Sequence, residues 1–268
     1  MLISVMAATI MLVSPAPAVR DGFVSVNGVR LHYVDWGGRG PIILFLIGGG
    51  GGSAHTFDTF APRFTNQFQV LGLTRRGQGP SDKPPSGYDT DTLARDIHAF
   101  LDTQRIERVI LIGHSIAGTE MTRFAALYPE RVSKLVYLDS ALDYARLDEI
   151  AKEAGFEGSP ADTPTGKIER GAAAAHPDFS KIKAPALAFV VVYEEALVSG
   201  PQDDAAYKRY LELMFEKRFW LEISRTFASS VPNGRVIQLH NTNHNFFKDP
   251  AQADGVVSQI EAFLLRQN

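Results

Sequence analysis

The pattern of apolar positions along the chain predicts a hairpin followed by a series of buried strands. Apolar and polar residues alternate over 23–26 and 30–34, on either side of Asn27-Gly28, the turn dipeptide typical of a two-residue hairpin. Unbroken apolar runs then occupy 42–47, 68–73, 108–113, 132–138 and 185–193. Runs without alternation are typical of parallel strands covered on both faces.

Helical periodicity lies between these runs. It is found near 54–65, 89–103, 116–128 and 250–266. Alternation of strands and helices predicts an α/β fold, a mostly parallel, doubly wound sheet of about eight strands that opens with an antiparallel strand. A further apolar stripe over 203–229 predicts one more helix, whose aromatic residues either pack in the core or wall a substrate pocket.

Length and composition indicate one large domain with an insertion. The chain has 268 residues, 45% of them hydrophobic, which is enough for one buried core and too little for two ordinary domains and a linker. We expect residues 22–140 and 185–268 to form the core. The intervening residues 141–184 are too many for a simple connection, so we expect a small cap or lid over the strand ends.

Residues 1–21 are predicted to be a signal segment or another N-terminal extension. The stretch 1–18 is apolar and uncharged, and it ends in Ala-Pro-Ala, a small-x-small pattern typical of a signal peptidase site. No Lys or Arg precedes the apolar run, which argues against export, and the run is too short for a stable membrane span. The protein is expected to be periplasmic or secreted if the segment is cleaved, and cytoplasmic otherwise.

Charge and composition exclude several classes of partner and cofactor. The net charge of −3 provides no basic field for nucleic acid, so we expect a small-molecule substrate. Without cysteine, the chain has no disulfide, thiolate nucleophile or cysteine metal site. The glycine run 48–52 lacks the Gly-Lys-Ser/Thr of a phosphate loop, and no ligand cluster is evident, so we expect neither metal nor organic cofactor. The sequence does not indicate an oligomeric state.

One short segment carries the strongest chemical signal. The residues GHSIAG at 113–118 directly follow an apolar strand and directly precede a helix. This is the context of a nucleophile elbow, a strained turn that exposes a serine hydroxyl above a sheet. The small Ala117 suits a position where strand and helix backbones approach closely. Ser115 is therefore the predicted nucleophile, and the alternative is a strand–helix turn with a capping serine.

Together with three other segments, this elbow resembles the α/β-hydrolase family. The others are the glycine loop after Ile47, the residues RGQGPSDKP at 76–84 and the Asn-His pair at 243–244, and the resemblance spans about 22–266. The Arg-Gly-x-Gly-x-Ser segment is typical of the lid-bearing branch, which includes esterases, lactonases, carbon–carbon bond hydrolases, epoxide hydrolases and haloalkane dehalogenases. The last two use an aspartate nucleophile, so a serine at the elbow argues against them.

A serine hydroxyl needs a base to take its proton, and the chain has seven histidines. His244 lies beyond the last predicted strand, 235–239, and before the C-terminal helix. This is where the resemblance places the catalytic histidine, and it satisfies the order serine, acid, histidine. His240 is the close rival. His114, beside the nucleophile, and Gly48 are expected to shape the substrate-binding site.

Three carboxylates are candidates for the acid that orients the histidine. In the family's usual pattern it follows the seventh strand about nine residues after a proline, which from Pro185 leads to Glu194, our first choice. Glu195 replaces it if the strand ends one residue later. Asp139, after the sixth strand, stands where some members carry the acid. Its task is to hold one imidazole tautomer and to stabilise the imidazolium.

An oxyanion hole is predicted from the backbone N–H groups of Ile116 and Gly49, each worth about 3–4 kcal/mol of barrier. Relatives usually have a histidine before the first glycine, where this chain has Ile47, so the loop loses a polar anchor and the glycine run gains freedom. We expect a carboxylesterase-like enzyme that cleaves a small ester. The same residues would serve a lactonase, amidase, carbon–carbon bond hydrolase or perhydrolase, and the rival is a non-catalytic small-ligand-binding protein with this fold.

Overall fold

The computed structural model describes residues 19–194 and 204–266. Residues 1–18 of the predicted N-terminal extension, and Glu195, lie outside these ranges. The strands are β1 (Arg20–Val26), β2 (Val29–Gly37), β3 (Ile42–Leu46), β4 (Gln69–Leu73), β5 (Val109–His114), β6 (Val132–Leu138), β7 (Ala186–Val191) and β8 (Gly234–Leu239). They form one sheet of order β1-β2-β4-β3-β5-β6-β7-β8.

The sheet has the predicted mostly parallel arrangement. β2 pairs antiparallel with β1 and β4, and every other neighbouring pair is parallel. The β1–β2 hairpin turns at Asn27 and Gly28, with φ of 48° and 76°. Both residues occupy the left-handed region that the tightest hairpin turns require, which is why this dipeptide predicted the turn.

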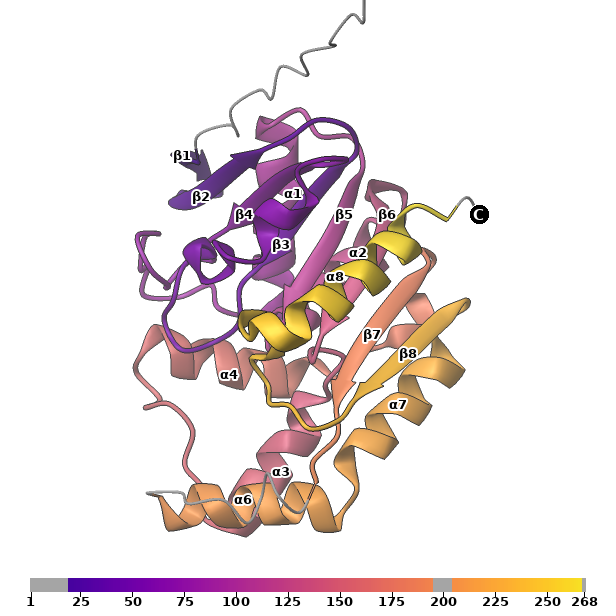
Figure 1. Ribbon diagram of the computed structural model, residues 1–268. Helices are drawn as coiled ribbons and strands as arrows, with labels where there is room; N and C mark the ends of the chain where they lie inside the picture. The colour runs from indigo at the N-terminus through magenta and orange to yellow at the C-terminus, as the bar shows by residue number, and fades with distance from the viewer. Residues whose placement is uncertain (1–18, 195–203, 267–268) are drawn as a thin grey trace, which may run out of the picture.

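Helices cover both faces of the sheet (Figure 1). They are α1 (Thr90–Thr103), α2 (Ala117–Leu127), α3 (Tyr144–Ala154), α4 (Pro164–Ala175), α6 (Ala205–Glu216), α7 (Phe219–Ser230) and α8 (Pro250–Leu264), with short 3-10 helices η1 (Ala54–Phe57), η2 (Ala61–Phe64), η3 (Pro129–Arg131), η4 (Phe179–Lys181) and η5 (Phe246–Lys248). In the described part of the chain, none of them combines the length and the apolar character that crossing a membrane demands.

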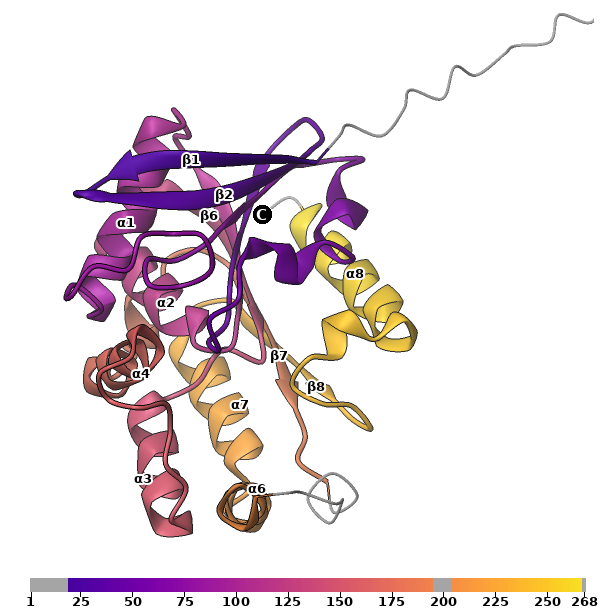
Figure 2. The ribbon, with the colours of Figure 1, turned by 90° about the vertical axis from the view of Figure 1, so that its left-hand side faces the viewer.

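The layers are clearest with the sheet seen nearly edge-on. Figure 2 shows α1, α2 and α7 on one face, α8 with η1 and η2 on the other, and α3, α4 and α6 gathered at one end. Two buried apolar clusters correspond to the two faces, one around Phe100, Phe124 and Phe227, the other around Phe45 and Ile260. Because α3 follows the carboxyl end of β6, the three gathered helices lie over the strand ends where such sheets place their sites.

Polar groups hold α8 against the sheet. Its first turn is capped by Asp249, whose side chain accepts a hydrogen bond from the Ala251 N–H. At its other end the Lys134 Nζ, from β6, donates to the carbonyl oxygens of Phe263, Leu264 and Arg266 at 2.7–3.1 Å. These carbonyls have no partner within the helix, so the lysine satisfies them and fixes the segment that follows His244.

Two helix predictions were wrong in detail. The segment 54–65 forms the two 3-10 helices η1 and η2 in place of one helix. The stripe over 203–229 is divided into α6 and α7 at Arg218, which has φ of 51°. The break lets each half bury its apolar side against a different partner: α6 packs on α3, and α7 packs on β7 and β8.

Candidate active site

Ser115 occupies a strained turn between β5 and α2. Its φ of +56° is rare for a residue with a side chain and costs on the order of 1–3 kcal/mol. Close packing enforces the turn: a Cβ added at Gly118 would lie 1.7 Å from the Ser140 carbonyl oxygen, and one added at Gly113 would lie 3.3 Å from the Ala117 Cβ. Ser115 is partly exposed at the carboxyl end of β5. This geometry is that of the predicted elbow.

His244 is paired with Asp139. The His244 Nδ1 lies 2.6 Å from the Asp139 Oδ2. The other carboxylate oxygen accepts a hydrogen bond from the Val191 N–H at 3.1 Å, so Asp139 is held between the ends of β6 and β7. The carboxylate is 3% exposed, whereas the imidazole is 37% exposed. A buried acid therefore orients the ring through Nδ1 and leaves Nε2 for proton transfer.

Glu194, the first choice for the acid, is paired with a different histidine. Its Oε1 lies 2.6 Å from the Nδ1 of His240, whose side chain is 55% exposed. The alternative, Asp139, makes the contact with His244. The physical reason is the position of the strand ends: Asp139 follows β6 directly at the sheet edge, whereas Glu194 lies beyond the end of β7. Glu195 is outside the described residues.

The Ser115 hydroxyl faces the tyrosine that begins α3. Ser115 Oγ lies 3.3 Å from the Tyr144 hydroxyl, and within 19–194 and 204–266 no hydrogen bond joins Ser115 to His244. The His244 ring nevertheless lies beside the elbow, because its centroid is 4.5 Å from the centroid of the His114 ring. Burial raises the pKa of Tyr144 well above its ordinary value. The phenol therefore stays protonated and can donate a hydrogen bond into the site.

His114 and Gly48, predicted to bind substrate, lie behind the reacting groups. His114 is 6% exposed, and its Nε2 donates to the backbone carbonyl of His244 at 2.9 Å. Its Nδ1 faces Gly48, where an added Cβ would lie 2.7 Å away. Burial first, and then the neighbouring His244, lower the pKa of His114 well below its ordinary value, so the ring is neutral. Both residues are buried, and they position the segment that carries His244 and the glycine loop.

The two predicted oxyanion donors are neighbours. Gly49 is exposed, and a Cβ added there would lie 3.9 Å from the Ile116 Cγ2. Ile116 stands at the N-cap of α2, and no side chain caps this end of the helix. The first N–H groups of a helix have no partners within it, and its dipole favours negative charge there. This corner can therefore stabilise an oxyanion formed at Ser115.

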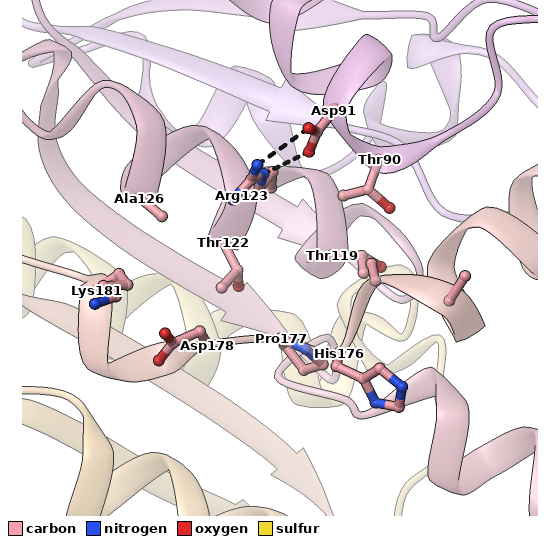
Figure 3. Close-up of a pocket in the computed structure, with 12 residues that line it drawn as sticks. Thr90, Asp91, Thr119, Thr122, Arg123, Ala126, His176, Pro177, Asp178 and Lys181 are labelled. Atoms are coloured by element: carbon pink, nitrogen blue, oxygen red, sulfur yellow. Dashed lines mark hydrogen bonds and ion pairs between the residues drawn. The ribbon is translucent and has the colours of Figure 1, made fainter.

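A separate hollow lies between α1, α2 and the segment that follows α4 (Figure 3). Its volume is about 380 Å³, and its lining includes Thr90, Asp91, Arg123 and His176. The Arg123 guanidinium forms an ion pair with the Asp91 carboxylate in its wall. None of the residues at the elbow or in the Asp139 pair lines this hollow, so it is not the site predicted from the sequence.

Comparison with known proteins identifies the fold. The model of the alpha/beta hydrolase fold matches residues 41–161. The crystal structure of Cfl2 from Burkholderia cenocepacia superposes with a TM-score of 0.67 at 20% identity, over 91% of this chain and 95% of that chain. The chain has the α/β-hydrolase fold.

Over part of its length, this chain is similar in sequence to curated relatives. It is 35% identical over 102 residues to a 2-(acetamidomethylene)succinate hydrolase of Mesorhizobium japonicum, which is 38% of this chain and 36% of that protein. It is 34% identical over 116 residues to a non-heme chloroperoxidase of Streptomyces lividans, 42% of each chain. The matches thus span well under half the length of these relatives.

An arginine that the sequence analysis missed anchors the glycine loop that carries the predicted oxyanion donor Gly49. Arg75 donates from Nη2 to the Ile47 carbonyl at 2.7 Å and from Nη1 to the Gly48 carbonyl at 3.3 Å. It also forms a two-fold ion pair with Glu120 of α2, at 2.7 and 2.8 Å, and both side chains are buried. The pair supplies the polar anchor that the loop lost with the usual histidine. The Arg-Arg dipeptide that follows Thr74 just after β4 was the available signal.

Proposed function

We propose that this α/β hydrolase is a serine hydrolase that cleaves a small carboxylic ester through an acyl-enzyme. Ser115 is the nucleophile, His244 the base, and Asp139 the acid that orients it. The observation that carries the proposal is the 2.6 Å contact between His244 Nδ1 and Asp139 Oδ2 at the same sheet edge as the strained elbow. A base oriented by a third group beside a serine is the signature of nucleophilic catalysis.

The reaction proceeds in two steps. Ser115 Oγ attacks the ester carbonyl carbon while His244 Nε2 takes the hydroxyl proton, and the buried Asp139 stabilises the imidazolium. The oxyanion is stabilised by the N–H groups of Ile116 and Gly49. His244 then returns the proton to the leaving alcohol. In the second step His244 activates water, which attacks the acyl carbon, releases the carboxylic acid and regenerates the serine.

Substrate binding has to redirect the Ser115 hydroxyl. In the structure it faces Tyr144, so it must rotate about its Cα–Cβ bond toward His244. A polar oxygen of the substrate then takes its place as the partner of the Tyr144 O–H. Among the helices that lie over the strand ends, the Phe156 ring packs with those of Tyr207 and Tyr210 from α6, with centroids 5.3–6.2 Å apart. An aromatic wall of this kind suits an ester with an apolar acyl or alcohol group.

One observation favours a second candidate, a protein that binds a small ligand without turning it over. The Ser115 hydroxyl is hydrogen-bonded to Tyr144 rather than to a base. A serine held in that orientation would contribute polarity to a binding site and no catalysis. The two candidates share the fold and differ only in the reactivity of one hydroxyl.

A fluorophosphonate probe separates these candidates, because it labels serines that are activated by a base. We expect prompt stoichiometric labelling of the wild type, none in Ser115→Ala, and undiminished labelling in Ser229→Ala, which removes an exposed serine of α7. Absence of labelling in folded wild-type protein would favour the binding protein. Turnover across esters of increasing acyl length, lactones and diketones then identifies the bond that is cleaved.

A further inference from the structure

Asp21 of β1, His32 of β2 and His55 of η1 bring their polar atoms together outside the candidate active site. The Asp21 Oδ1 lies 3.2 Å from the His32 Nε2 and 2.9 Å from the His55 Nε2. We propose that these three side chains bind one divalent transition-metal ion of the zinc type. Two imidazoles and a carboxylate are a donor set that such ions accept.

The spacing of the three donor atoms fits a small ion. They all lie within 4.8 Å of one another. A tetrahedral zinc site with bonds of about 2.0–2.1 Å places its ligand atoms about 3.3 Å apart. The two separations from the Asp21 Oδ1, 3.2 and 2.9 Å, are close to this value, and the two imidazole nitrogens need to approach it from a distance of at most 4.8 Å. The Asp21 side chain is 56% exposed, whereas that of His32 is 3% exposed. The buried histidine anchors the site, and its open side leaves a fourth position for water.

Outer partners orient both histidines for this role. The His32 Nδ1 lies 2.8 Å from the Thr74 hydroxyl, and the His55 Nδ1 lies 2.9 Å from the Asp58 carboxylate. Asp58 is fixed in turn by the Trp36 indole N–H at 2.9 Å. Histidine ligands of metals characteristically donate their second N–H to such a group, which directs the other nitrogen at the metal.

His55 shows why a cation belongs here. Both of its ring nitrogens face carboxylate oxygens, Asp21 on one side and Asp58 on the other. A neutral imidazole has only one N–H, so one nitrogen would present its lone pair to a carboxylate. A metal on Nε2 removes that conflict, as a second ring proton would, and leaves the N–H on Nδ1 to donate to Asp58.

The bound ion would fasten η1 to the β1–β2 hairpin. η1 directly follows the loop that carries Gly49, so the site restrains one end of the candidate oxyanion loop. Thr74 already joins the same elements, because its hydroxyl oxygen accepts the Ala54 N–H at 2.9 Å and faces His32. A ligand that binds the folded state alone stabilises it by mass action, so the protein should gain thermal stability with the metal.

Metal titration tests the proposal on the full chain. After treatment with a chelator, Zn²⁺ is titrated in competition with a chromophoric indicator, and we expect one ion per chain. Asp58→Asn, which removes an outer partner, should weaken binding about 10–100-fold. The double variant Asp21→Asn/His55→Gln should lose the site. His240→Gln removes the exposed Glu194–His240 pair instead and should bind as the wild type does.

Two results would overturn the site: no stoichiometric binding by the wild type, or equal affinity in the double variant. Asp21 and His55 are exposed, and circular dichroism checks that the variants fold. If the double variant does not fold, His55→Gln alone carries the comparison. Thermal unfolding gives a second readout. Zn²⁺ should raise the Tm of the wild type and of His240→Gln but not that of the double variant, and an unchanged wild-type Tm would refute the fastening role.

Discussion

The protein contains two histidine–carboxylate pairs near the strand ends with the same separation and different surroundings. His244 and Asp139 are 2.6 Å apart, and so are His240 and Glu194. Their carboxylates are 3% and 32% exposed, respectively. Burial strengthens a hydrogen bond, whereas water and salt screen an exposed pair. The short distance therefore does not distinguish the candidate catalytic pair from a surface pair. The burial of the carboxylate does.

The buried pair is also held from both sides. The second oxygen of Asp139 accepts the Val191 N–H, and the backbone carbonyl of His244 accepts a hydrogen bond from His114. The imidazole is thus oriented by the sheet edge and by the elbow together. Catalysis needs a base whose position is fixed before the substrate arrives, which the exposed pair does not provide.

The largest expected effect separates the two histidines. His244→Gln should lower kcat by about 10⁶-fold, because without the base the serine proton has no acceptor. His240→Gln should change kcat by less than about threefold, as expected for a surface pair. Steady-state hydrolysis of the best ester from the substrate panel measures both. A large loss in His240→Gln with an active His244→Gln would exchange their roles.

The two carboxylates should differ next. Asp139→Asn should lower kcat by about 10⁴-fold, since the amide favours the wrong imidazole tautomer and cannot stabilise the imidazolium. Glu194→Gln is the matched control and should stay close to the wild type. If Glu194→Gln instead showed the greater loss, the acid would belong to the end of β7 after all.

A third pair extends the comparison from activity to stability. Arg75→Met leaves the Glu120 carboxylate buried without its partner and should lower the free energy of unfolding by about 3–5 kcal/mol. Arg209→Met removes an exposed arginine that pairs with Glu216 and should cause no measurable loss. Urea unfolding followed by circular dichroism gives both values. The double variant Arg75→Met/Glu120→Leu should recover part of the loss, and further loss would contradict this explanation.

The smallest effect concerns the histidine behind the buried pair. His114 has a lowered pKa, so below its ordinary value of 6.5 the unfolded chain binds a proton that the folded protein does not. Stability should therefore fall as the pH decreases from 7 to 5, with up to about 2 kcal/mol due to this ring. His114→Gln keeps an N–H donor for the His244 carbonyl and should show a flatter pH dependence of the unfolding free energy. His240→Gln should keep the wild-type slope.

The sequence by itself determined the features that depend on short stretches of chain. The apolar runs located the strands, Asn27-Gly28 located the hairpin turn, and the residues 113–118 predicted the elbow that the backbone of Ser115 adopts. Each of these is signalled by residues that are neighbours along the chain, because turn conformation and the apolar pattern of a strand are written in consecutive residues.

Only the tertiary structure decided which side chains meet. The partner of His244 lies 105 residues away along the chain, and the choice between Asp139 and Glu194 depended on where β6 and β7 end relative to each other. The same holds for Arg75, which is hydrogen-bonded to the glycine loop, and for the trio of Asp21, His32 and His55. Such contacts require side chains from separate segments to come within about 3 Å of one another. A sequence pattern predicts the type of each segment but not how far its side chains lie from those of another segment.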